Sequence, residues 1–159
     1  MVATSRPRTV SPQLRRAQVA LGSFLAWTAF VWVGRIRNAV SDPELVGADK
    51  AGPLLLAASL LVPAIVLAVA WVGSWRARRT LDRRAAVLLV VLAVWTTALW
   101  IVRAVDIAAF GDWGIGFVVV HTVLAVVSIG LAAWAVVADR ASRSLEHTSA
   151  LTASQEDMS

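Results

Sequence analysis

The stretch AGPLLLAASLLVPAIVLAVAWVGSW, residues 51–75, runs for 25 residues without a charge. Three further uncharged runs cover residues 17–34, 85–102 and 113–138. The hydrocarbon core of a bilayer is about 30 Å thick, and a helix needs roughly 20 residues to cross it. A chain that is 58% hydrophobic, with a mean hydropathy of +0.72, is also too apolar for a soluble domain of 159 residues. The four runs therefore predict an all-α membrane protein with four transmembrane helices.

Basic residues are unevenly distributed between the two ends of these predicted helices. With both termini in the cytoplasm, the inner side carries eleven arginines: Arg6, Arg8, Arg15, Arg16, Arg76, Arg78, Arg79, Arg83, Arg84, Arg140 and Arg143. The outer side carries four basic residues: Arg35, Arg37, Lys50 and Arg103. Cytoplasmic loops are enriched in arginine and lysine, so this distribution predicts that both termini are cytoplasmic.

The expected location is the bacterial plasma membrane, because abundant alanine, valine and arginine with little lysine is typical of GC-rich bacterial genomes. We expect the inner arginines to contact anionic lipid headgroups at the cytoplasmic face. These contacts account for the net charge of +5 without a nucleic-acid partner.

Two segments of the chain resemble each other: WTAFVWVGRIRN at residues 27–38 and WTTALWIVRAVD at residues 95–106. At a constant offset of 68, Trp27, Thr28, Trp32 and Arg35 match Trp95, Thr96, Trp100 and Arg103, and Asn38 matches Asp106. Tryptophan and arginine are uncommon inside membrane helices, so this match indicates an internal repeat. The helices that follow match more weakly, at an offset of 64. We predict two helical hairpins in the same orientation, which is a parallel repeat.

These patterns divide the chain into five segments. Residues 1–16 are predicted to be a disordered basic cytoplasmic tail, because they carry Pro7 and Pro12 among basic residues. Residues 17–76 form hairpin 1, residues 77–84 a basic cytoplasmic loop, and residues 85–140 hairpin 2. Residues 141–159 are polar and rich in serine and threonine, which predicts a second disordered cytoplasmic tail.

The repeated residues form a stripe along each helix. Positions 28, 32, 35 and 38 step by four, three and three, so they share one helix face, and residues 96, 100, 103 and 106 do the same. Asp106 lies three residues after Arg103 and is its natural partner, while Asn38 and Asp42 follow Arg35. The arginines could anchor to outer headgroups, clamp helices together or bind a ligand. Anchoring is the favoured interpretation.

His121 is the only histidine within the four apolar runs. It could join Arg103, Asp106 and Asp112 in a titratable outer-leaflet cluster, although a hydrogen bond to a backbone carbonyl is the favoured interpretation. The candidate binding residues are Arg35, Asn38, Arg103, Asp106, Asp112 and His121. We expect no metal site and no cofactor, and the absence of cysteine excludes thiolate ligands and disulfides.

The residues Trp100, Arg103, Asp106, Asp112, Gly116, His121 and Ser128 follow an order that resembles small actinobacterial two-helix integral membrane proteins of uncharacterised function. The resemblance covers about thirty residues of hairpin 2 and, in part, hairpin 1, where Ala57 stands at the histidine position. It implies a membrane hairpin, here in tandem, and no mechanism.

Two functions fit the sequence. The first is an accessory or structural subunit that packs against a membrane-complex partner or forms a homodimer. The alternative is a small solute or ion transporter or channel that uses the outer-leaflet arginine, aspartate and histidine cluster. Four-helix multidrug exporters generally use an acid near the middle of their first helix, and the run at residues 17–34 has none. No HExxH or GxSxG motif is present, so we do not expect an enzyme.

Overall fold

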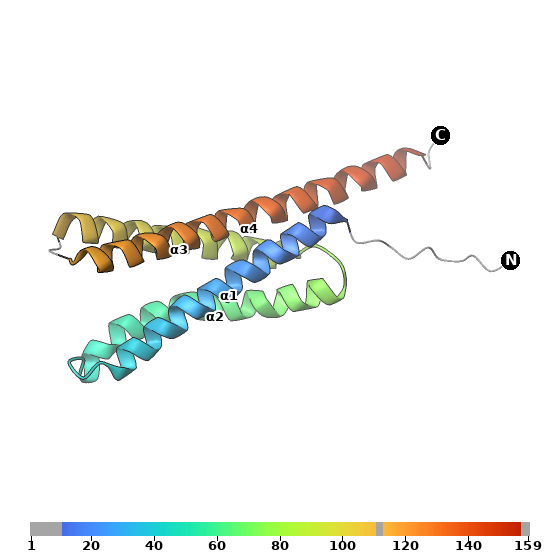
Figure 1. Cartoon of the computed structure of the whole chain (residues 1–159). Coiled ribbons are helices and arrows are strands. Elements are labelled where there is room, and N and C mark those ends of the chain that lie inside the picture. Colours follow the sequence, from blue (N-terminus) through green and yellow to red (C-terminus); the bar gives the residue numbers. More distant parts are fainter. Residues whose placement is uncertain (1–10, 111–112, 157–159) are drawn as a thin grey trace.

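The computed structural model of the chain describes residues 11–110 and 113–156, which form four long helices (Figure 1). These are α1 (Pro12–Ser41), α2 (Ala51–Arg76), α3 (Arg83–Phe110) and α4 (Ile115–Glu156), with a short 3-10 helix, η1 (Gly47–Lys50), before α2. Each long helix contains a segment that is long and apolar enough to cross a membrane. The predicted all-α fold with four candidate membrane spans is confirmed.

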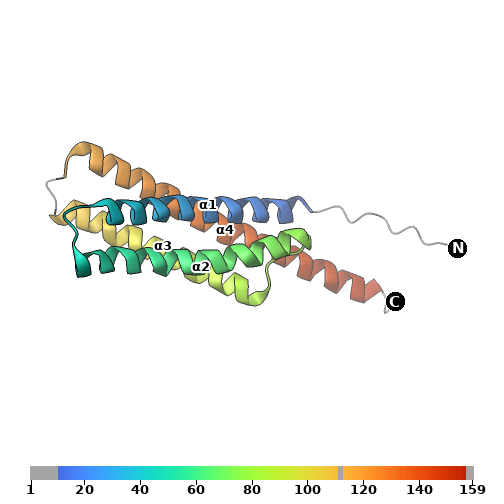
Figure 2. The same ribbon diagram turned by 90° about the horizontal axis from the view of Figure 1, so that it is seen from below.

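The helices run up and down in two hairpins, α1 with α2 and α3 with α4. Helix α1 also packs along α4, and α2 meets α3 less extensively. The ends of α1 and α3 and the starts of α2 and α4 lie at one end of the bundle, which also carries Arg35 and Arg103 and is called the arginine end. The start of α1, the α2–α3 loop and the far end of α4 lie at the other end, called the loop end (Figure 2).

The centre of the bundle is filled by large apolar side chains. Phe24, Leu60, Leu67, Leu89 and Leu92 are fully buried, and they come from α1, α2 and α3. Helix α4 contributes small residues to this core, such as Ala132 and Ala135. Many large apolar side chains, such as Leu55 and Val69, remain exposed, as expected for helices that face lipid.

Helices α1 and α4 both extend beyond the segments that the sequence patterns assign to the membrane. Helix α1 begins at Pro12 rather than after residue 16, because the Ser11 side chain accepts a hydrogen bond from the Leu14 N–H (3.2 Å) and proline suits the first helical position. Helix α4 continues to Glu156. The prediction of a disordered tail is therefore wrong for residues 141–156. Residues 139–156 contain no glycine or proline to end the helix.

Helices α1 and α2 approach closely at Gly22. A Cβ atom at this position would lie 2.8 Å from Cζ2 of Trp71, so only glycine leaves room for the indole. The Trp71 Nε1–H donates to the carbonyl of Gln18, one turn earlier on α1 (3.1 Å). Small residues at helix interfaces allow this kind of contact in membrane proteins.

Candidate functional site

The threonine and tryptophan of each predicted stripe face the interior of the bundle to the same extent. Thr28 and Thr96 are each 3% exposed, and Trp32 and Trp100 are 7% and 8% exposed. Matched positions on α1 and α3 therefore occupy similar environments. The stripes end at the arginine end with Arg35 and Asn38 on α1 and with Arg103 and Asp106 on α3.

A cleft of about 270 Å³ lies between these stripes and is called the arginine cleft. Its lining residues are Val31, Trp32 and Arg35 of α1, Leu56 of α2, and Leu99, Trp100, Val102, Arg103 and Asp106 of α3. A neighbouring cleft of about 330 Å³ shares Trp32, Arg35 and Leu56 with it and also touches Asn38 and Asp42. Four of the candidate binding residues, Arg35, Asn38, Arg103 and Asp106, therefore line one continuous region.

Arg103 is held by several contacts. Its Nη1 donates to Oδ2 of Asp106 at 2.5 Å, which confirms the ion pair expected from their spacing. Its guanidinium also lies 5.6 Å from the ring centre of Trp113 and 5.5 Å from that of Phe117, within the range of cation–π attraction. Its Nε atom is buried and has no hydrogen-bond partner. The guanidinium is thus held by these contacts, and its buried Nε–H donor is unsatisfied.

Arg35 is the matched arginine on α1, and its surroundings differ. Arg35 is exposed, and it forms no ion pair with any residue in 11–110 or 113–156. The partners suggested by spacing do not bind it: the Asp42 carboxylate accepts from the Glu44 N–H (2.9 Å), and Asn38 is exposed. The polar residues that follow Arg35 therefore do not pair with it. Arg35 is an unpaired cation that lines both clefts.

His121 lies on α4, away from both clefts. Its Nδ1 is 2.9 Å from the carbonyl oxygen of Phe117, which confirms the favoured interpretation of a hydrogen bond to the backbone. Its ring also lies 3.9 Å from that of Phe117, the ring that Arg103 contacts. The Phe117 ring therefore lies against both Arg103 and His121, and within the described residues no hydrogen bond or ion pair joins His121 to Asp106. Asp112 lies outside the described residues.

Two tryptophans tie the hairpins together by similar hydrogen bonds in opposite directions. The Trp27 indole N–H donates to Ser128 of α4 (2.9 Å), and the Trp95 indole N–H donates to Ser59 of α2 (3.1 Å). The tryptophans are 68 residues apart, as in the predicted repeat, whereas the serines are 69 apart rather than 64. Each hairpin thus donates one tryptophan hydrogen bond to a serine of the other. The serines, however, are not matched at the offset of 64 expected between α2 and α4.

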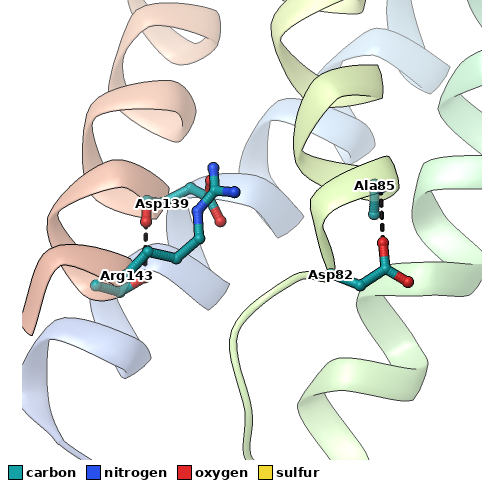
Figure 3. A network of polar contacts seen from close by, with 5 residues as sticks. Asp82, Ala85, Asp139 and Arg143 are labelled. Atoms are coloured by element: carbon teal, nitrogen blue, oxygen red, sulfur yellow. Dashed lines mark hydrogen bonds and ion pairs between the residues drawn. The ribbon is translucent and has the colours of Figure 1, made fainter. Parts of the chain in front are cut away.

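The loop end contains a buried acid, Asp139, that is not among the candidate residues predicted from the sequence. Asp139 is 4% exposed and accepts a hydrogen bond from Arg143, one turn later on α4 (Figure 3). On the other side of the same view, Asp82 caps α3 by accepting from the Ala85 N–H at 2.8 Å. An aspartate directly after an uncharged run, with an arginine at i+4, is the signal that identifies the Asp139 pair.

The described residues include no cluster of three or more histidine, cysteine, aspartate or glutamate side chains that could hold a metal ion. What the arginine cleft offers is positive charge, hydrogen-bond donors and apolar walls. This combination favours binding of an anion that has an apolar part.

Among known proteins, a family match is found for the second half of the chain. No curated protein and no solved structure matches the chain. Residues 79–149, which include all of α3 and most of α4, match the SCO4848-like family, an uncharacterised family. The match spans hairpin 2, where the resemblance to two-helix membrane proteins was noted, and covers less than half of the chain. Hairpin 2 is therefore similar to the SCO4848-like family.

Proposed function

We propose that this protein is a small integral membrane protein with an accessory or structural role, which packs through α4 against a membrane partner or a second copy of itself. The proposal includes no catalytic step and no cofactor. It rests on one observation, the uncovered outer face of α4.

That face has the spacing of a helix-packing seam. Residues 119, 123, 126, 130, 133 and 137 step alternately by four and three, so they lie along one side of α4. All six are exposed in the chain, and four of them are valines. A Cβ atom at Gly130 would have open space around it, so this glycine serves no packing within the chain, unlike Gly22. Small residues on a membrane helix let a second helix approach closely.

Helix α4 is also the least buried of the four helices. Among the apolar windows of the four helices, 39% of residues are buried in α1 and in α3, but only 11% in α4. Helix α4 therefore carries the least covered apolar surface of the four. A membrane partner that packs on α4 would bury this surface together with the seam.

A transporter or channel is the second candidate, and the two clefts at the arginine end are the observation that favours it. Both clefts lie beside Arg35, and below them Phe24, Leu60 and Leu89 fill the middle of the bundle. A solute would have to displace these fully buried side chains to pass. The accessory role requires no such rearrangement, so we rank it first.

The absence of cysteine allows a direct test by site-specific cross-linking. Ala133→Cys places a thiol on the α4 seam, and Val69→Cys places one on the exposed face of α2 as a matched control. A maleimide–benzophenone reagent attached to each thiol in native membranes captures any protein within reach. We expect a discrete adduct from Ala133→Cys, of twice the mass for a second copy or of another mass for a partner. If both variants yield only the lone chain, the proposed role is wrong.

We also assign the loop end to the cytoplasm, because the basic residues concentrate there. A membrane-impermeant maleimide tests this orientation with two exposed positions, Glu44→Cys at the arginine end and Gln155→Cys near the end of α4. We expect labelling of Glu44→Cys in intact cells and of Gln155→Cys only after the membrane is opened. The reverse pattern would invert the assigned topology.

A further inference from the structure

We propose that the arginine cleft binds the phosphodiester headgroup of an acidic phospholipid, with the start of an acyl chain lying along its apolar walls. This site is separate from the α4 seam and goes beyond the accessory role. It also differs from headgroup contacts at the basic loop end, because it lies between two hairpins at the other end of the bundle.

The charges in the cleft do not balance. Arg35 and Arg103 bring two positive charges, and Asp106 brings one negative charge that is already bonded to Arg103. The sum is one positive charge, carried by Arg35, at the edge of a low-dielectric region. An unpaired charge in such a region is costly, whereas a single negative charge on a ligand would neutralise it. Phosphatidylglycerol carries one negative charge, and zwitterionic phosphatidylethanolamine carries no net charge.

The lining of the cleft also has more hydrogen-bond donors than acceptors. The Nε atom of Arg103 is buried without a partner, and in the described part of the chain neither the Arg35 guanidinium nor the indoles of Trp32 and Trp100 form a hydrogen bond. Guanidinium and indole groups can only donate. A ligand that satisfies them must therefore supply acceptors, and the oxygens of a phosphodiester do so.

The arginines lie near the boundary between the hydrocarbon core and the headgroup region. Helix α1 has 30 residues and α3 has 28, so at 1.5 Å per residue they are about 45 and 42 Å long. The hydrocarbon core is about 30 Å thick, which leaves about 6–8 Å of helix beyond it at each end. Arg35 and Arg103 lie six and seven residues before the ends of their helices, or about 9 and 10.5 Å, which places them a few ångströms inside this boundary. Both arginines thus lie close to the core boundary.

The shape of the cleft fits a headgroup better than a whole lipid. Its volume of about 270 Å³ corresponds to about nine water molecules at about 30 Å³ each. Val31, Leu56 and Leu99 supply apolar walls, and Val102 is 65% exposed at the rim. A lipid in the surrounding bilayer can therefore reach the cleft with its headgroup and leave most of its chains outside.

The test uses the full-length protein purified in detergent and titrated with single lipids in native mass spectrometry. The probes are phosphatidylglycerol and phosphatidylethanolamine with identical oleoyl chains. We expect phosphatidylglycerol to bind about tenfold more tightly, as for a desolvated charge pair, and Arg35→Ala to remove this preference. The control is Arg37→Ala, which removes the same charge from an exposed residue that lines neither cleft. Equal binding of the two lipids, or an equal loss in both variants, would overturn the proposal.

A second variant separates binding from a general loss of structure. Asp106→Asn removes the carboxylate that competes with the lipid phosphate for Arg103, so we expect tighter binding of phosphatidylglycerol by about threefold. A merely damaged bundle would bind more weakly instead, and this result would count against the site. Inorganic phosphate is the remaining probe. If it displaces the lipid at millimolar concentration, the cleft recognises a soluble anion and the assignment to a lipid is wrong.

Discussion

The two hairpins place the same four side-chain types at matched positions and use the last one differently. Arg103 of hairpin 2 is bonded to Asp106 and lies against Trp113 and Phe117. Arg35 of hairpin 1 has none of these contacts, because Asn38 stands where hairpin 2 has Asp106. One change from acid to amide therefore separates a structural arginine from one that is free to bind. The comparison teaches that a repeated motif need not repeat a role.

The packing between the two helices of each hairpin differs as well. A substitution at this contact is expected to change stability the most. Gly22 lets α1 approach the Trp71 indole, whereas the matched positions in hairpin 2 are Val90 and Ala135. Gly22→Leu should lower stability by about 3 kcal/mol, because the new side chain overlaps the indole and displaces it from the Gln18 carbonyl. The measurement is the midpoint of unfolding of the purified protein in detergent.

The control for this substitution is Gly34→Leu on the same helix, where a Cβ atom meets nothing within 4 Å. We expect a change below about 0.5 kcal/mol there. Equal destabilisation by the two substitutions would mean that leucine harms α1 through its general properties, and the close approach of α1 and α2 would lose its significance.

Asp139 gives the next largest effect and concerns only hairpin 2. Asp139→Ala removes a buried carboxylate and leaves Arg143, which is one third exposed, without its partner. We expect a loss of about 2 kcal/mol in the free energy of unfolding. Asp42→Ala, directly after α1, serves as the control and should change stability little, because that half-buried carboxylate accepts only the Glu44 N–H and has no ion pair within the described residues. A small effect of Asp139→Ala would show that the pair adds nothing beyond the helix itself.

The arginines themselves provide the direct test of the comparison. Arg103→Ala should lower stability in lipid-free detergent by about 1 kcal/mol, because it removes one ion pair and two cation–π contacts. Arg35→Ala should change stability in the same detergent little, because no hydrogen bond or ion pair within the described residues is lost. If the two variants behave alike, the distinction between a structural and a free arginine is wrong.

Much of this architecture follows from the sequence, because uncharged runs, helix periodicity and the spacing of Arg103 and Asp106 are local properties of the chain. The failures are also local in origin. Pro12 suggests disorder, although Ser11 before it caps a helix, and the polar composition of residues 141–156 suggests a disordered tail where the structure has a helix. The isolation of Arg35 could not be predicted, since it depends on which helices meet at the arginine end. The internal repeat stays a prediction, supported by the equal burial of its threonine and tryptophan pairs.

The smallest expected effects on stability come from the two tryptophan hydrogen bonds. The two bonds are alike, but one serine acceptor is buried and the other is exposed. Ser128 is 2% exposed, and its hydroxyl loses its tryptophan donor in Trp27→Phe. Ser59 is exposed and keeps its own hydrogen bond to the Leu56 carbonyl (2.7 Å) in Trp95→Phe. We therefore expect a loss of about 1 kcal/mol for Trp27→Phe and about half of that for Trp95→Phe.

A double-mutant cycle assigns the larger loss to the hydrogen bond itself. Trp27→Phe and Ser128→Ala should together lower the unfolding free energy by less than the sum of their separate effects, with a coupling of about 0.6 kcal/mol. The cycle of Trp95→Phe with Ser59→Ala should show a smaller coupling, because that bond joins exposed residues at 3.1 Å. Equal couplings would mean that both bonds hold the hairpins together to the same degree. The two halves would then differ only at the arginine end, where Asn38 replaces Asp106.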